Sequence, residues 1–272
     1  MSKLRVFYQS FCKHAPKHTF LPALQKQPFT QLQVCAYYVL WEVIGMQYVY
    51  EAKLVTREFK KEFTYENEPV LQVSIQYPEV ALFGNKAAAD NINRFYKNNA
   101  KAYFTYASTK LLSDAISNYE YARQNKFPFH MYDAVMKYTV TLNANCYLST
   151  YIDQYEYTGG AHGNTVRTSQ NFSLKSGRGV LLPQLFPPGV SYRKMILSQI
   201  IKMADQNVRE GQNIYFDNYK ELIIKNFNPK SFNLNPDTVS FYYQQYEIGP
   251  YVSGIITFDI PYEAIGAKRP RC

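Results

Sequence analysis

The segment Tyr-Glu-Tyr-Thr-Gly-Gly-Ala-His-Gly, at residues 155–163, lies between two stretches in which apolar and polar residues alternate. Alternation with a period of two is typical of β-strands. Glycine adopts positive φ without steric cost and lets another backbone come close. The sequence therefore predicts a sharp turn between two strands, with Gly159, Gly160 and Gly163 as candidates for positive φ that alanine would destabilise.

His162 is the only titratable side chain inside this turn, and the unperturbed pKa of histidine lies near neutrality. Asp153 and Glu156 are close to it in sequence. An acid–base role for His162 is one interpretation, and a histidine that hydrogen-bonds to the backbone of a structural turn is the other. There is no Gly-x-Ser-x-Gly motif that would mark a serine nucleophile.

Three segments follow one another in a fixed order: residues 157–163 (Tyr-Thr-Gly-Gly-Ala-His-Gly), 181–186 (Leu-Leu-Pro-Gln-Leu-Phe) and 241–251 (Phe-Tyr-Tyr-Gln-Gln-Tyr-Glu-Ile-Gly-Pro-Tyr). Together they resemble the RsiV-type extracellular domain, catalogued as a domain of unknown function and named after an anti-sigma factor. The resemblance implies a bacterial cell-envelope module that recognises lysozyme. Residues 55–151 resemble the companion domain at the N-terminus of PdaC-type peptidoglycan deacetylases.

Patterning and resemblance together divide the chain into four parts. We expect a basic N-terminal segment with a marginal apolar run (1–50), a PdaC N-terminal-like α+β domain (51–155), an RsiV-like α+β domain (156–265) and a basic tail (266–272). The predicted fold class is α+β, with antiparallel sheets, helices packed on them and two closely associated subdomains. The catalytic domain that follows in PdaC-type deacetylases is not expected in this sequence.

Local patterns predict the individual elements. The turn at residues 66–69 is expected to join two strands, the second of which ends before Pro78. Apolar residues at three- and four-residue spacing predict a helix over residues 87–123, and Ser191 is placed to cap another that runs to Arg209. The remaining expected elements are one long strand at 132–148 that bends near 149 and continues to 157, a strand at 164–174, a hairpin at 175–179, a short helix capped by Asp217, and strands at 239–243 and 255–260.

Composition places the chain among folded globular proteins, with 46% hydrophobic and 19% charged residues. It contains 26 Tyr and 18 Phe but one Trp, and tyrosine suits half-buried strands. The same residues suit a broad recognition surface, because tyrosine supplies contact area at low entropic cost.

The net charge of +9 is concentrated at the ends of the chain. The first 30 residues hold five basic and no acidic side chains, and the last five hold three basic ones, which leaves +1 for the residues between them. A nucleic-acid binder carries its positive charge on the folded surface. We therefore expect no nucleic-acid partner, and keep binding of an anionic polymer by the two tails as a separate alternative.

The cysteines and histidines are dispersed. Cys12, Cys35, Cys146 and Cys272 form no Cys-x-x-Cys pair, so neither a zinc site nor a dense disulfide framework is expected, and Cys146 is expected to pack as a small apolar residue. His14, His18, His130 and His162 are equally scattered, and no nucleotide-binding motif is present. The sequence predicts no metal and no cofactor.

The first 50 residues contain no ordinary signal peptide. Residues 29–50 have about the length of a membrane span but include Glu42 and several glutamines, which make insertion costly. Membrane association through residues 29–50 stays open. The resemblance implies an extracytoplasmic or membrane-anchored location in a Gram-positive bacterium.

Taken together, these observations predict a non-catalytic recognition or sensor module that binds a lysozyme-like protein or a peptidoglycan-derived ligand. The alternative is a wall-directed hydrolase or deacetylase-associated protein that uses His162. The candidate binding residues are Tyr157, Gly159, Gly160, His162, Gly163, Tyr246, Glu247 and Tyr251.

Overall fold

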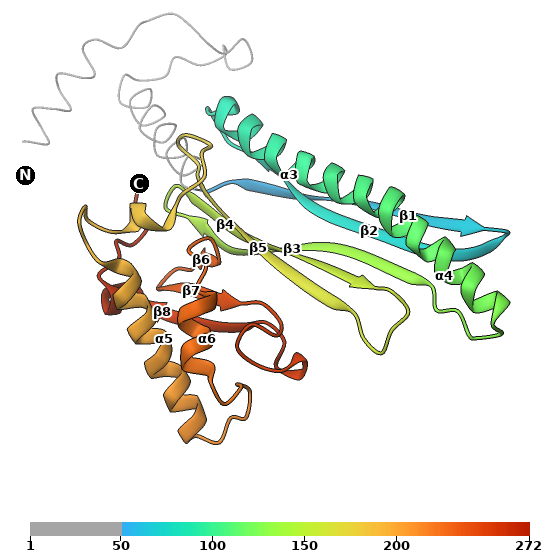
Figure 1. Cartoon of the computed structure of the whole chain (residues 1–272). Helices are drawn as coiled ribbons and strands as arrows, with labels where there is room; N and C mark the ends of the chain where they lie inside the picture. Colours follow the sequence, from blue (N-terminus) through green and yellow to red (C-terminus); the bar gives the residue numbers. More distant parts are fainter. Residues whose placement is uncertain (1–50) are drawn as a thin grey trace, which may run out of the picture. The chain divides into compact units, whose positions relative to one another are not determined.

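The computed structural model describes residues 51–272. The expectations for residues 1–50, including Cys12, Cys35 and the apolar run, lie outside the described residues. Within 51–272 the fold is α+β, as predicted, with a five-stranded and a three-stranded sheet (Figure 1). No helix in this part of the chain has the length and hydropathy of a membrane span.

The first sheet has the order β1-β2-β3-β4-β5. Its strands are β1 (Lys53–Tyr65), β2 (Glu68–Ala81), β3 (Tyr132–Ala144), β4 (Tyr147–Tyr157) and β5 (Asn164–Ser173). Neighbouring strands are antiparallel except β2 and β3, which run parallel. Parallel neighbours need a long crossover, and the helical segment between β2 and β3 provides it.

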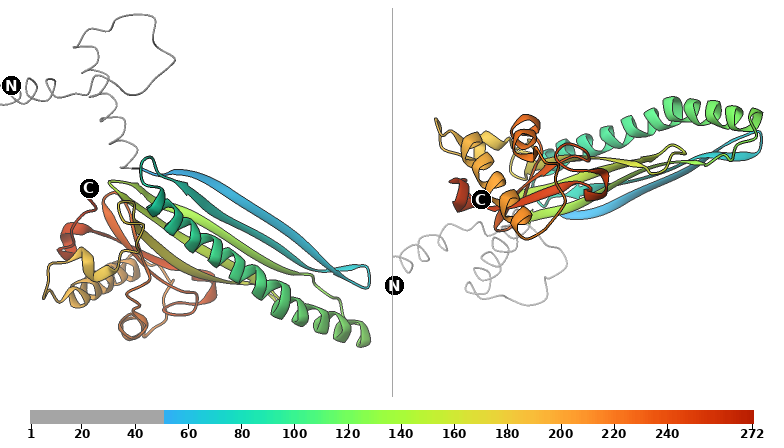
Figure 2. Two further views of the ribbon diagram at one scale, coloured as in Figure 1. Left: turned by 90° about the horizontal axis from the view of Figure 1, so that it is seen from above. Right: turned by 60° about the horizontal axis from the view of Figure 1, so that its bottom comes forward.

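The crossover helix covers one face of this sheet (Figure 2). It consists of α3 (Lys86–Tyr106), a π-helical turn (Ala107–Leu111) and α4 (Leu112–Gln124), close to the predicted 87–123. The predicted apolar stripe is buried against the sheet at Ile92, Tyr96, Tyr103, Ala107 and Leu111. The π turn, which inserts one extra residue into the helix, was not predicted.

The single strand predicted at 132–148 is wrong, because β3 and β4 form a hairpin there. Asn145 and Cys146 make its two-residue turn, with φ of 53° and 67°. Two consecutive residues with positive φ are characteristic of a type I′ hairpin turn. The sequence alternates without interruption through this turn, so the pattern alone concealed it. A register shift between Val140 and Leu142 also points the side chain of Leu142 away from the core beneath α3. Leu142 instead joins a second core, which contains the residues of the second sheet.

Smaller corrections concern segment ends. β2 continues through Pro78, where β3 no longer pairs with it and proline is tolerated at the open edge. The hairpin predicted at 175–179 is reduced to one bridge between Phe172 and Gly179, and a 3₁₀ turn (Leu182–Leu185) follows instead of a strand. Asn218, not Asp217, precedes the short helix.

The second sheet has the order β6-β7-β8, with β6 (Phe232–Leu234), β7 (Thr238–Tyr243) and β8 (Ile256–Pro261). The last two were predicted, whereas β6, only three residues long, was not. Helices α5 (Tyr192–Arg209) and α6 (Tyr219–Asn226) accompany this sheet and contribute Ile196, Ile200 and Ile223 to the second core. Ser191 precedes α5 as predicted but makes no side-chain capping hydrogen bond.

Side chains of the first sheet bond to β6, whose other edge pairs with β7. Thr141 Oγ1 donates to the Leu234 carbonyl at 2.8 Å, and Asn171 Nδ2 donates to the Phe232 carbonyl at 2.9 Å. The Leu234 amide in turn donates to Ser149 Oγ at 3.0 Å. We call this contact, together with Asn233, the polar joint. It satisfies buried backbone groups that would otherwise be costly to bury.

Asn233 occupies the centre of the polar joint and is buried. Its Nδ2 donates to the Thr150 carbonyl at 2.7 Å, and its Oδ1 accepts from Ser169 Oγ at 2.8 Å. One amide side chain thus connects β6 to both β4 and β5, which fixes the second sheet against the first.

A disulfide joins Cys146 in the β3–β4 turn to Cys272, the last residue, across a sequence separation of 126. The expectation that Cys146 is only a small apolar residue is therefore wrong. Positive φ at Cys146 places its side chain in the turn, where the C-terminal segment reaches it. The turn and the end of the chain are covalently fixed together.

Replacing Asn233 with alanine is expected to lower the free energy of unfolding by about 2–4 kcal/mol, because it leaves buried partners in β4 and β5 unpaired. Urea denaturation measures this change. As a control, Asn98→Ala on the exposed face of α3 is expected to stay within about 0.5 kcal/mol of the wild type. Equal effects of the two substitutions would contradict the structural role of the polar joint.

Candidate functional site

The loop between β4 and β5 and the loop between β7 and β8 meet beside the edge of β5. Gln245 Oε1 accepts from the Thr165 amide at 2.7 Å. Gln244 Oε1 accepts from the Arg167 amide at 2.9 Å, and Gln244 Nε2 donates to the Arg167 carbonyl at 2.7 Å. The two glutamine side chains thus take the place of a neighbouring strand and cover part of the edge.

The two loops bring aromatic rings together at the surface. His162 stacks on Tyr251 with ring centroids 3.7 Å apart and planes inclined by 19°. Tyr246, which is 53% exposed, lies 5.8 Å from the ring of Tyr251. Val252, 88% exposed, is next in the chain. We call His162, Tyr246, Tyr251 and Val252 the aromatic loop surface.

An ion pair on β4 and β5 lies close to the glutamine contacts. Arg167 donates from Nε and Nη2 to the two oxygens of Asp153, both at 2.7 Å, and its guanidinium lies 3.7 Å from the centre of the Tyr151 ring. Burial alone would lower the pKa of Arg167, but the bonds and charge of Asp153 outweigh it and raise that pKa. The planar pair stiffens β4 and β5, the strands that carry the loop with His162.

Glu247 is half-buried and fixes the β7–β8 loop. Its Oε2 accepts from the Gln244 amide at 2.7 Å, and its carbonyl accepts from Asn226 Nδ2 at 2.6 Å. Burial raises the pKa of Glu247 above the ordinary 4.5, which the hydrogen bond from Gln244 partly offsets. Glu247 therefore acts in loop structure more than as an exposed charge.

The candidate glycines behave differently from one another. Gly159 has φ of 83°, as expected, whereas Gly160 and Gly163 do not have positive φ, so the expectation is wrong for these two. Gly163 is buried, and a Cβ there would overlap the ring of Tyr155. At Gly160 a Cβ would meet open space. Gly249, which was not singled out, lies against the backbone carbonyl of Ile214, where a Cβ would collide.

The structure brings some of the candidate binding residues together on one surface and places others elsewhere. His162, Tyr246 and Tyr251 form one surface, with Glu247 below it. Tyr157 is the last residue of β4 and pairs with Asp133 of β3, so it precedes the loop that carries His162. Gln244, Gln245 and Val252 were not among the candidates. The two glutamines belong to a segment that carried the family resemblance, but nothing in their sequence indicates that their amides would bond to β5.

His162 has few partners for acid–base chemistry. Its Nδ1 lies 3.3 Å from the Gly163 carbonyl, the one hydrogen bond of its ring within residues 51–272. Asp153 is bound to Arg167, and Glu156 accepts from Tyr106 Oη at 3.2 Å. Within the same residues, no three His, Cys, Asp or Glu side chains are grouped closely enough to hold a metal ion.

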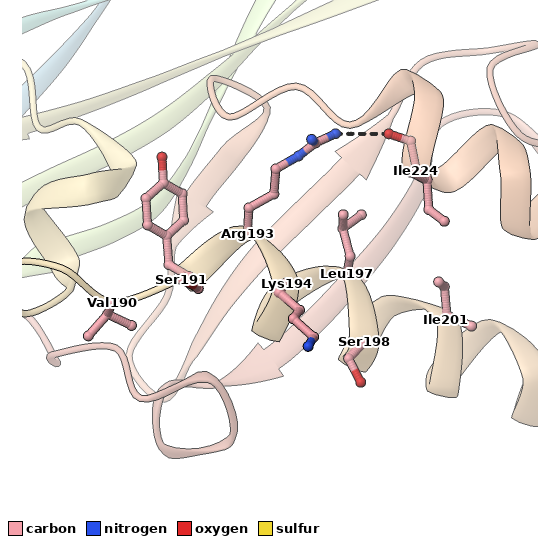
Figure 3. A pocket seen from close by; sticks show the side chains of 9 residues that line it. Val190, Ser191, Arg193, Lys194, Leu197, Ser198, Ile201 and Ile224 are labelled. Atoms are coloured by element: carbon pink, nitrogen blue, oxygen red, sulfur yellow. Dashed lines mark hydrogen bonds between the residues drawn. The ribbon is translucent and has the colours of Figure 1, made fainter.

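An open groove of about 780 Å³ lies between α5 and α6 (Figure 3). Leu197, Ile201 and Ile224 form its apolar part, and Arg193 donates across it to the Ile224 carbonyl at 3.0 Å. Its residues are separate from those of the aromatic loop surface.

Comparison with known proteins accounts for both halves of this architecture. Residues 64–165 match the family model described as deacetylase PdaC, and residues 183–263 match the model described as a protein of unknown function, DUF3298. In these two regions the chain is similar to a PdaC-type region followed by a DUF3298 domain. The order agrees with the order expected from the sequence motifs.

Two solved structures share the fold of the described region. A DUF3298 family member from Bacteroides fragilis has a TM-score of 0.59 and 19% identity, over 82% of this chain and 96% of its own. A DUF3298 family protein from Pseudomonas aeruginosa has a TM-score of 0.51 and 17% identity, over 81% of this chain and 95% of its own. At these identities the similarity concerns the fold. No curated protein matches the sequence.

Alanine substitutions at the glycines test the geometry of the two loops. Gly249→Ala is expected to destabilise the most, because its Cβ would collide with the Ile214 carbonyl. Gly159→Ala is expected to destabilise by about 1 kcal/mol, because alanine is strained at positive φ. Gly160→Ala is the matched control and is expected to stay within about 0.5 kcal/mol of the wild type. Thermal unfolding measures all three, and a loss of stability at Gly160 as large as at Gly249 would contradict this geometry.

Glu247→Gln tests the buried carboxyl. Because burial raises the native pKa of Glu247, its contribution to stability falls as pH rises through that pKa. Glutamine keeps an oxygen that accepts from Gln244 without the charge, so the variant is expected to lose less stability than the wild type between acidic and neutral pH. Urea denaturation at the two pH values checks this.

The exposed Glu68→Gln at the start of β2 serves as the control for that comparison and is expected to leave the pH dependence unchanged. An unchanged pH dependence in Glu247→Gln would show that Glu247 is solvated in the native protein.

Proposed function

We propose that this chain is a non-catalytic recognition module of the bacterial cell envelope that binds a peptidoglycan-derived glycan through the aromatic loop surface. The observation that carries this proposal is the stacked pair of His162 and Tyr251 beside the exposed ring of Tyr246. The apolar C–H faces of sugar rings pack on aromatic faces, while sugar hydroxyls reach water or the tyrosine hydroxyls. Flat rings carried on surface loops suit such a ligand.

The charges near this surface favour a glycan over lysozyme. Lysozyme is a basic protein, and association with it gains from a negative surface that steers the encounter. The nearby carboxylates are already engaged, Asp153 by Arg167, Glu156 by Tyr106 and Glu247 by the Gln244 amide. A neutral sugar surface needs no such steering.

The disulfide supports a location outside the cytoplasm. Disulfides persist in oxidising compartments and are rare where thiols are kept reduced. Cys146 and Cys272 are paired, so the described region contains no free cysteine. The PdaC family is described as a deacetylase, and the sequence resemblance connects that region to peptidoglycan enzymes. We propose an extracytoplasmic module on these grounds.

The direct test is binding of the full chain to immobilised soluble peptidoglycan fragments at physiological salt. Tyr251→Ala and Tyr246→Ala are each expected to weaken saturable binding by roughly tenfold, because each removes one stacking face. Tyr121→Ala, which truncates a tyrosine of similar exposure on α4, is the matched control and is expected to bind like the wild type.

Binding of the full chain to immobilised lysozyme is measured in parallel with the same variants. Saturable binding to lysozyme that depends on Tyr246 and Tyr251, without binding to the glycan, would replace the glycan by a protein partner. Equal loss of glycan binding in the Tyr121 control would refute the assignment of the surface.

A further inference from the structure

β1 is the outer strand of the first sheet, and no other element of residues 51–272 pairs with its free edge (Figures 1 and 2). It is 13 residues long and contains no proline, and its register shift falls near the end, between Phe63 and Thr64. An open edge of this length is a template for another strand, and natural proteins usually shorten, bulge or cover such edges. The opposite edge of the sheet, at β5, is partly covered by Gln244 and Gln245.

The side chains of β1 form two rows. Val55, Phe59 and Phe63 alternate with Arg57 and Lys61 in one row, and Phe59 packs edge-on against Phe104 of α3 with ring centroids 4.9 Å apart. Phe59 nevertheless remains 43% exposed. On the other face, Lys60 Nζ lies 2.9 Å from Glu58 Oε1. One row therefore alternates between apolar and basic residues, and the other row carries opposite charges, along the same edge.

We infer that β1 is the surface through which two copies of this chain associate, by antiparallel β1–β1 pairing about a two-fold axis at Phe59. Phe59 is the middle residue of the strand, so this register pairs its whole length. It places Phe59 opposite Phe59 of the second copy and Val55 opposite Phe63. It also places Glu58 opposite Lys60 on both sides of the axis. Aromatic and opposite-charge pairs stabilise cross-strand contacts.

Other registers are disfavoured by the charges. If the axis moves by one or two residues, a charged residue lies opposite its own copy, at Arg57, Glu58, Lys60 or Lys61. Like charges directly opposite each other are destabilising. The register at Phe59 does place Arg57 opposite Lys61, but Arg57 is already paired with Glu79. A two-fold axis between two residues is excluded. Such an axis would place side chains of opposite faces against each other, so the sheet of one copy would be turned over relative to the sheet of the other.

The test is the mass of the full chain in solution, measured by light scattering after size-exclusion chromatography over a range of concentrations. The wild type is expected to approach twice the monomer mass of 31.7 kDa. Glu58→Lys and Lys60→Glu are each expected to weaken dimerisation by about tenfold, because each creates two like-charge pairs across the axis. The double variant exchanges both charges and is expected to restore the dimer.

The restoration distinguishes pairing in this register from a general effect of surface charge. Val166→Lys on β5, an exposed position outside β1, is the control and is expected to dimerise like the wild type. A wild type that stays monomeric at every concentration would overturn the inference and show that the charges of β1 protect the edge. A dimer unaffected by either single reversal would also overturn it.

Discussion

The second sheet depends on hydrogen bonds that side chains of the first sheet make to the backbone of β6. Three residues are too few for a strand to be stable alone, and one edge of β6 would be buried without partners. Thr141, Ser149 and Asn171 supply those partners, and Asn233 returns bonds to the first sheet. Directional bonds of this kind fix orientation as well as contact.

That orientation is what assembles the candidate site. With β6 held against the first sheet, β7 carries Gln244 and Gln245 to the edge of β5. The two loops then meet, although His162 and Tyr251 are far apart in sequence, and their rings stack. The Arg167–Asp153 pair stiffens the strands on which this contact rests. The polar joint and the aromatic loop surface are therefore parts of one arrangement.

Local sequence patterns predicted the elements that bury one face against a single core. The stripe from Ile92 to Leu111 identifies the long helix, because one face of it packs on a single core. The same reasoning failed for residues 132–148, where the alternation continues across the turn at Asn145 and Cys146. Because of the register shift near Leu142, β3 contributes side chains to two cores on opposite faces of one sheet. A local alternation pattern predicts one buried face and does not indicate this change.

The candidate site was predicted in part for a similar reason. His162, Tyr246 and Tyr251 were chosen from motifs and turn chemistry, and the structure brings them together. Gly160 and Gly163 were expected at positive φ because a glycine-rich turn suggests it, but Gly163 is needed for the close approach of Tyr155. The roles of Gln244 and Arg167 arise from tertiary contacts, which a single sequence does not display.

The most direct test of this account follows the His162 ring itself. In the full chain with isotope-labelled histidine, NMR resonances of His162, assigned with His162→Gln, are followed during titration with soluble peptidoglycan fragments. We predict that the His162 signals shift progressively and saturate together with binding of the fragments. Saturable binding with unchanged His162 signals would contradict it.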